Sequence, residues 1–192
     1  MWRLLLTDDD RLTDPGKVLR QLNRGDWIIL RSRSAVRRRE LFQLCRPICR
    51  RAGIKLIIAG TLREALRLGA DGVHLSEQRT RSLAGPLKTP KSGFLISTAC
   101  HSAQALARVG RLPSMTAALI SPVFETRSHP GTRALGRLGF YALVRRAGLK
   151  QGQAIKLVAL GGMTANSFKR LTCGTSRHTP KPAGYAGISG FI

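Results

Sequence analysis

The stretch "KLIIAGTLREALRLGADGVHL", residues 55–75, decides the fold class. It opens and closes with apolar runs that lack regular polar alternation, which is typical of parallel strands buried on both faces. Between these runs, apolar residues recur at spacings of three and four, as on one face of a helix. The stretch therefore predicts a strand over Lys55–Ala59, a helix over Leu62–Leu68 that ends at Gly69, and a strand over Gly72–Leu75.

The same alternation recurs along the whole chain. Further strands are predicted over Leu4–Thr7, Trp27–Arg31, Phe94–Thr98, Ala118–Ser121, Ile155–Leu160 and Tyr185–Ser189. Further helices are predicted over Pro15–Leu22, Glu40–Ala52, Ala103–Val109, Phe140–Ala147 and Asn166–Leu171. Pro47 is expected to kink or shorten the helix that contains it, because proline has no N–H to donate.

Eight strands separated by helices predict an α/β protein with a compact (β/α)8 TIM barrel, built as one domain over residues 1–192. An open doubly wound sheet is the alternative, and it needs fewer strands. The chain leaves almost nothing after the eighth strand, so we expect the final helix to be absent. We then expect a packed loop, or a partner subunit as in a homodimer, to cover the part of the barrel wall that the final helix would otherwise cover.

Charge limits the classes of partner. The chain has 33 Lys and Arg against 10 Asp and Glu, a formal net charge of +23, which creates a strong positive field. Basic residues are nevertheless scattered, with only Arg37, Arg38 and Arg39 in a tight run, and two Trp and two Tyr are few for stacking on bases. The scattered distribution of charge argues against a nucleic-acid partner. The positive field would also attract a small phosphorylated ligand.

No apolar run is long enough to span a bilayer, and three aspartates follow too soon for a signal peptide, so we expect a cytoplasmic protein without a membrane partner. The four cysteines show no paired CxxC spacing and are expected to be reduced. Cys45 and Cys49 lie four apart on a predicted helix. They are either two buried small residues, which we favour, or half of a zinc site.

In a barrel of this kind, chemistry belongs to the loops after the carboxyl ends of the strands. Polar residues and glycines concentrate there: Asp8–Asp10, Arg31–Arg33, Ser76–Gln78, Cys100–Ser102, "FETRSHPGTRALG" (residues 124–136), Gly161–Thr164 and Gly190. Gly161 and Gly162 precede Thr164, a residue suited to cap a helix, so their backbone N–H groups are candidates to bind a phosphate together with Ser189. The alternative is a tight turn that only needs glycine torsions.

Five motifs resemble the strand ends of the thiamine phosphate synthase and TenI (thiazole tautomerase) family. They are "GADGVHLSE" (69–77), "TACHSAQAL" (98–106), "LISPVFETRSHPG" (119–131), "VALGGMTANS" (158–167) and "GISGF" (187–191). The resemblance implies a barrel that handles the thiazole phosphate of thiamine biosynthesis. It implies that Gly161, Gly162, Ile188 and Ser189 hold the phosphate and that Thr126 and Ser128 line the substrate site.

The chain departs from the synthase branch of that family in its metal and diphosphate residues. The glutamine, arginine and lysine after strand two become Ile29, Arg31 and Arg33, the asparagine-aspartate pair after strand three becomes Ala59 and Gly60, and the acidic run after strand four reads Glu77, Gln78 and Arg79. No metal ligand is therefore predicted, and Mg²⁺ is expected only if Glu77 or Asp8–Asp10 replace the missing carboxylates. Otherwise Arg31 and Arg33, with Arg79, would bind the diphosphate.

The chain also departs from the tautomerase branch. Pro122 stands where that branch has its histidine, so an acid/base would have to be His101 or His129. Each has a structural alternative. His101 would cap a helix or bond to the backbone, and His129 would lie in an exposed turn. His74 is expected to be a core residue. Three functions stay open. We favour a divergent enzyme that catalyses either the condensation or a proton shift. The alternatives are a non-catalytic phosphate-binding protein and a scaffold for nucleic acid.

Overall fold

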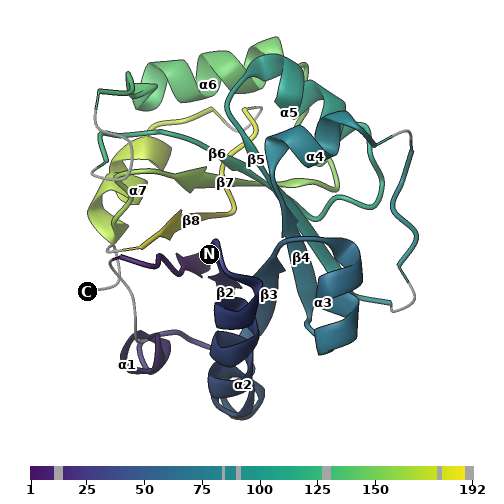
Figure 1. The fold of residues 1–192 in the computed structure, drawn as a ribbon. Coiled ribbons are helices and arrows are strands. Elements are labelled where there is room, and N and C mark those ends of the chain that lie inside the picture. Colours follow the sequence, from purple (N-terminus) through teal and green to yellow (C-terminus); the bar gives the residue numbers. More distant parts are fainter. Residues whose placement is uncertain (11–14, 84, 90–91, 127–130, 177–178, 189–192) are drawn as a thin grey trace.

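The chain folds into a closed barrel of eight parallel strands that follow one another around the ring in sequence order (Figure 1). The computed structural model describes residues 1–192 except 11–14, 84, 90–91, 127–130, 177–178 and 189–192. The strands are β1 (Trp2–Leu6), β2 (Trp27–Leu30), β3 (Lys55–Ala59), β4 (Gly72–Leu75), β5 (Leu95–Cys100), β6 (Ala117–Ile120), β7 (Lys156–Leu160) and β8 (Gly184–Gly187). Because β1 pairs with β8, the predicted barrel is confirmed and the open sheet is excluded.

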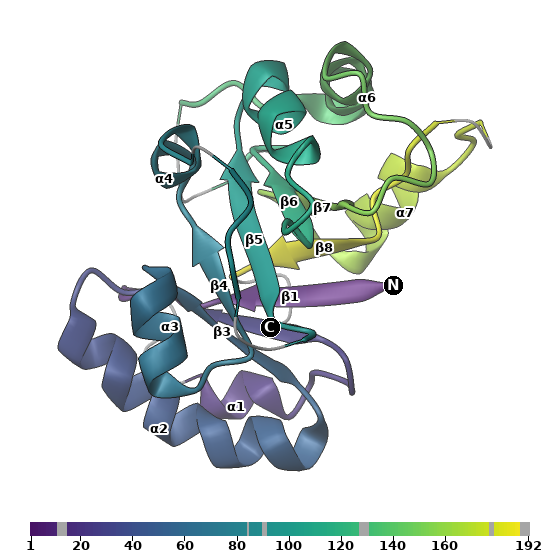
Figure 2. The ribbon, with the colours of Figure 1, turned by 90° about the vertical axis from the view of Figure 1, so that its right-hand side faces the viewer.

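Helices cover the outside of the barrel (Figure 2). They are α1 (Gly16–Leu19), α2 (Ala35–Ala52), α3 (Leu62–Leu68), α4 (Glu77–Arg81), α5 (Ala103–Gly110), α6 (Gly136–Arg146) and α7 (Ala165–Thr172). After β8, the described residues form no helix. None of the helices in the described ranges is long and apolar enough to cross a membrane.

Several helices differ from the sequence prediction. α1 ends at Leu19 rather than Leu22, and α6 begins at Gly136 rather than Phe140. α2 begins at Ala35 rather than Glu40, because the Ser34 side chain accepts a hydrogen bond from the Arg37 N–H and starts the helix before the arginine run. It also continues through Pro47, so the predicted shortening is wrong. Pro47 and Gln43 both lie on the exposed face, where water can hydrate the carbonyl that proline leaves without a donor. α4 was not predicted, and it is little more than one turn long.

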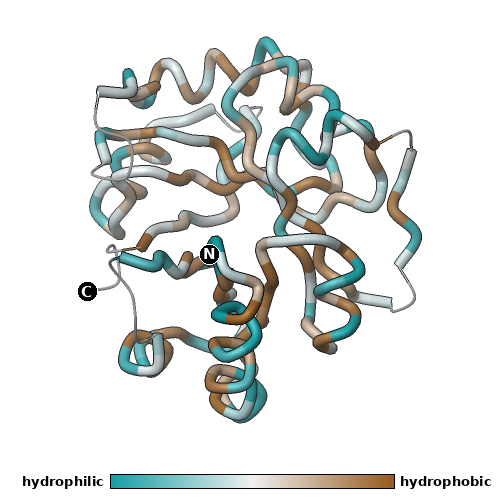
Figure 3. Tube along the Cα trace, in the orientation of Figure 1, coloured by the Kyte–Doolittle hydropathy of each residue, from teal (hydrophilic) through white to brown (hydrophobic). Residues whose placement is uncertain are grey.

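Buried apolar side chains form two layers. Figure 3 colours the hydrophobic residues of the chain brown. One layer lies inside the barrel and is built from residues such as Leu4, Ile29, Ile57 and Val158. The other lies between the strands and the helices, and there Cys45 and Cys49 are 0% and 1% exposed. The interpretation of these two cysteines as small packing residues is confirmed.

The amino ends of the strands are closed by side chains. The Trp2 and Trp27 rings lie 5.0 Å apart, and next to them the Asp26 carboxylate accepts hydrogen bonds from the Arg3 guanidinium (2.6 and 2.9 Å), the Arg3 N–H and the Asn23 N–H. The Asp26 side chain is only 6% exposed. This end is a structural plug, which leaves the carboxyl ends of the strands for ligands.

Candidate functional site

The turn after β7 requires glycine at two consecutive positions. Gly161 and Gly162 have φ angles of 92° and 60°. A Cβ at Gly161 would lie 3.0 Å from the Cα of Pro122, and one at Gly162 would overlap the Glu125 carbonyl oxygen. The tight turn weighed as an alternative to phosphate binding is therefore real, and a ligand role for these glycines stays a prediction.

The N–H groups of this turn are available for an acceptor. Within the described part of the chain, neither the Gly161 nor the Gly162 N–H donates a hydrogen bond. Thr164 caps α7, because its Oγ1 accepts from the Ser167 N–H at 3.1 Å while its own N–H donates to the Ser167 Oγ at 2.7 Å. The cap therefore does not use the N–H groups of the two glycines that precede it.

Neighbouring segments fix this turn in place. The Val123 and Phe124 N–H groups donate to the Leu160 and Gly161 carbonyls at 2.9 and 3.0 Å, so the loop after β6 is bonded to the turn after β7. On the other side, Leu160 pairs with Ala186, which brings Gly162 and Ile188 out of adjacent strands at the same edge. Ile188 is half-buried and packs on both apolar layers.

Three predicted site residues lie outside the described residues: Ser128, His129 and Ser189. Thr126 is described and half-buried, and it follows Glu125, whose carbonyl contacts the glycine turn. The far end of this loop returns to its start, because the Leu135 and Gly136 N–H groups bond to the Pro122 and Val123 carbonyls at 3.0 and 2.8 Å. The described part of the loop therefore borders the candidate phosphate site.

His101 lies at the end of β5 and is held by Ser121 at the end of β6. Its Nδ1 is 3.0 Å from the Ser121 carbonyl oxygen and 3.2 Å from the Ser121 Oγ. Because a carbonyl only accepts, Nδ1 carries the proton in this contact and neutral His101 keeps an acceptor at Nε2. The predicted backbone bond is confirmed, and the residue is exposed.

Glu77, at the start of α4, supports the same histidine. Its Oε2 accepts from the His101 N–H at 2.9 Å, and its Oε1 accepts from Arg81 at 2.8 Å. Partial burial alone would raise the pKa of Glu77, but these two hydrogen bonds and the neighbouring positive charges hold it below its ordinary value. Glu77 is therefore an ionised, fully engaged carboxylate.

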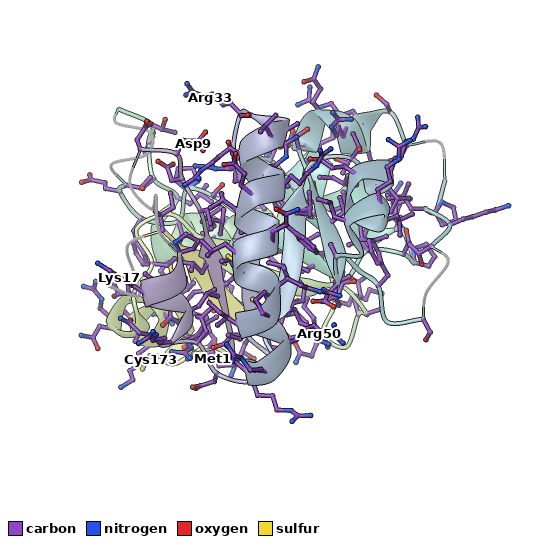
Figure 4. All side chains as sticks on the ribbon, turned by 60° about the horizontal axis from the view of Figure 1, so that its bottom comes forward. Met1, Asp9, Lys17, Arg33, Arg50 and Cys173 are labelled. Atoms are coloured by element: carbon purple, nitrogen blue, oxygen red, sulfur yellow. The ribbon has the colours of Figure 1, made fainter. Side chains whose placement is uncertain are left out.

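Arg31 and Arg33 follow β2 and are tied to the aspartates that follow β1. The Arg31 Nη2 is 2.7 Å from the Asp8 Oδ2, and the Arg33 N–H donates to the Asp9 Oδ2 at 3.1 Å. That backbone hydrogen bond, with one from the Ser32 hydroxyl, lowers the pKa of Asp9. Figure 4 shows Arg33 and Asp9 near one end of α2, with Arg50 near its other end.

His74, which the sequence predicts as a core residue, is buried in β4. Its neighbours Val73 and Leu75 face the helices, so His74 points into the barrel, where its Nδ1 lies 3.0 Å from the Ser97 Oγ. Burial, and then the positive charge of Arg31, lower its pKa from 6.5 to about 4. The prediction of a hydrogen-bonded core residue is confirmed, but this neutral imidazole lies inside the barrel beneath Arg31.

The carboxylates at the mouth do not fit a magnesium ion. Glu64 lies over Gly60, where a Cβ would overlap its Oε2, and it is clamped by Arg38 at 2.9 and 3.2 Å. Asp8, Asp9 and Glu77 have the partners given above. Among the described residues, no three His, Cys, Asp or Glu side chains come together as metal ligands. Mg²⁺ coordination prefers several free oxygens grouped together. Asp8, Glu64 and Glu77 are already bonded, and the exposed Asp9 and Asp10 are too few to form such a group.

The fold and the mouth define a TIM barrel whose polar groups and free N–H donors gather at the carboxyl ends of its strands. The chain belongs to the Thiamine monophosphate synthase family, because the family's sequence profile matches residues 4–179. The suspected family is thereby confirmed.

Individual relatives agree with this membership. Thiamine-phosphate synthase of Listeria monocytogenes serotype 4a (strain HCC23) is 28% identical over 148 residues, covering 73% of this chain and 64% of that protein. Thiamine-phosphate synthase of Bacillus velezensis is 30% identical over 127 residues, covering 62% and 50%. The chain therefore spans less than two thirds of the length of these relatives.

Solved structures show the same fold. Thiamine phosphate pyrophosphorylase from Pyrococcus furiosus has a TM-score of 0.68 at 18% identity, covering 96% of this chain and 83% of that one. Citrate synthase SbnG has a TM-score of 0.60 at 11% identity, covering 97% and 85%. Likeness at these identities shows the barrel alone, so activity has to be argued from the residues at the mouth.

Proposed function

We propose that this protein acts in thiamine biosynthesis as a single barrel domain over residues 1–192 that binds a thiazole phosphate. The observation that carries the proposal is the pair of N–H groups on Gly161 and Gly162, which have no acceptor within the described residues. Free N–H groups on a glycine turn before a helix are suited to bind a phosphate. Ile188, Ser189, Thr126 and Ser128 complete this proposed site.

The favoured reaction is the condensation of the thiazole phosphate with a pyrimidine diphosphate, as in the synthases that the chain resembles. The glycine turn would hold one substrate by its phosphate, and Arg31 and Arg33 would bind the diphosphate of the other. Family membership supports this transferase activity. Among the described residues no set of carboxylates fits a divalent cation, so the proposed chemistry differs from metal-assisted departure of the diphosphate.

A second candidate is a proton shift on a carboxylated thiazole phosphate. The geometry of His101 favours it, because Nδ1 is occupied by Ser121 and Nε2 stays available to accept a proton. His129 is the other proposed acid/base. A binding protein without turnover is the third outcome, and assays of both reactions separate these cases. The proposal includes a cytoplasmic location and a homodimer. Light scattering of the purified protein checks the homodimer.

Thermal unfolding with hydroxyethylthiazole phosphate tests the binding claim. We expect the ligand to raise the midpoint of the parent protein and to raise that of Gly161→Ala much less, because the added methyl group displaces the turn against Pro122. Gly152→Ala is the matched control. Gly152 has a similar φ of 87° and no atom within 4 Å of its added Cβ.

A ligand shift that survives in Gly152→Ala and is lost in Gly161→Ala supports the proposal. The absence of any shift in the parent protein would overturn it. Equal ligand-induced shifts of the midpoint in both variants would show that the phosphate does not bind at the turn after β7.

A further inference from the structure

We propose that the β1–β4 side of the barrel mouth binds a diphosphate through arginine side chains, without a divalent cation. This inference rests on the proposed function, because a diphosphate is the group that the condensation would release. It goes further by assigning charge neutralisation to guanidinium groups of this chain.

The first argument is that two of the local carboxylates are already paired with arginines. Asp8 pairs with Arg31, and Glu64 is held by Arg38, with the Arg38 and Glu64 side chains only 14% and 23% exposed. A cation entering here would have to break these ion pairs. A mostly buried arginine left without its carboxylate is costly, so the arginines oppose the entry of a metal.

The second argument is the geometry of Arg31. Its backbone is fixed by Thr7, whose Oγ1 accepts from the Arg31 N–H at 2.7 Å and donates to the Arg31 carbonyl at 3.0 Å. Only Nη2 of its guanidinium bonds to Asp8, and the side chain is 42% exposed. Asp8 therefore orients a guanidinium whose remaining N–H groups are open to a ligand.

The third argument is that nearby arginines are not neutralised. Within the described residues, the Arg33 and Arg79 guanidinium groups form no ion pair or hydrogen bond. Arg33 comes two residues after Arg31, and Arg79 lies in the first turn of α4, after the strand two places along the ring. Between these strands, β3 ends in Ala59 and Gly60, and the Glu64 carboxylate that lies over Gly60 is paired with Arg38.

Isothermal titration with inorganic pyrophosphate tests this inference, once in EDTA and once with excess Mg²⁺. We expect binding of similar affinity in both solutions, and about tenfold weaker binding by Arg31→Gln, since a hydrogen bond to a charged group is lost. Arg50→Gln is the control. It removes the same charge from the exposed last turn of α2, at the other end of that helix (Figure 4).

Binding that requires Mg²⁺ would overturn the inference, and so would equal losses in Arg31→Gln and Arg50→Gln. Hydroxyethylthiazole phosphate is titrated in parallel. If it binds and pyrophosphate does not in either solution, the inference fails and the proposed function stands. If neither ligand binds, the proposed function fails as well.

Discussion

The Nδ1 atom of His101 lies 3.0 Å from the carbonyl oxygen of Ser121. This contact joins the ends of β5 and β6 and fixes which nitrogen of the ring accepts a proton. Pro122, the position of the histidine in the tautomerase branch, directly follows Ser121. The structure thus brings an imidazole from the neighbouring strand to the same part of the mouth.

If His101 transfers a proton, His101→Gln should lower the rate of the thiazole tautomerisation about 100-fold or more. The dissociation constant of the thiazole phosphate should stay nearly unchanged, because the glycine turn is untouched. Ser121→Ala keeps the carbonyl contact and should cost much less. A wild-type rate in His101→Gln would exclude this role.

Protonation of His74 should make stability depend on pH. Its pKa is about 4 in the folded protein and 6.5 otherwise, so the unfolded chain binds the proton more readily. The contribution of neutral His74 to the free energy of unfolding is complete above pH 6.5 and is lost as the pH falls toward 4. At 1.36 kcal/mol per pKa unit, the loss is about 3 kcal/mol. Urea unfolding of the parent protein and His74→Gln should show a steeper decline in the parent protein across this range.

Asp26 should matter more for stability than an exposed carboxylate. Asp26→Asn leaves the Arg3 guanidinium without its negative partner in a nearly buried setting, and we expect a loss of about 3 kcal/mol in the free energy of unfolding. Glu40→Gln is the control, because its ion pair with Arg37 joins side chains that are 57% and 45% exposed. Chemical denaturation measures the free energy of unfolding of both variants. Similar losses would contradict the structural role assigned to Asp26 at the amino ends of the strands.

The cysteines should differ sharply in reactivity. Cys173 is exposed, whereas Cys45, Cys49 and Cys100 are buried. Burial raises the pKa of Cys49 and Cys100 to about 12, which keeps them as unreactive thiols. Titration of the native protein with a disulfide reagent should label one thiol quickly and the others only after denaturant is added. Rapid labelling of all thiols would show that the layer between the strands and the helices opens readily.

Sequence patterns predicted the barrel well because its strands and helices are regular. Stretches such as residues 55–75 carry apolar runs and glycine ends that define each element locally. The beginning of α2 was missed because Arg37, Arg38 and Arg39 hide the apolar pattern, while the cap at Ser34 is a single side-chain contact. α4 was missed because its single turn has almost no periodicity.

The glycine turn and the polar strand ends were also visible in the sequence. The partners of the charged groups were not, because they depend on contacts between segments far apart in the chain. Glu64 lies over Gly60 and pairs with Arg38, which is 26 residues away. His74 could have been assigned to the barrel interior from the apolar residues on both sides of it, but its link to Ser97 required the register of β4 and β5.

The most direct test of the proposed site is to follow the backbone amide signals of Gly161 and Gly162 by NMR while hydroxyethylthiazole phosphate is added. Binding at the turn after β7 predicts large, saturable downfield shifts of these two amide protons, because their N–H groups gain a charged acceptor. Saturable binding that leaves both signals unchanged would contradict the proposed phosphate site.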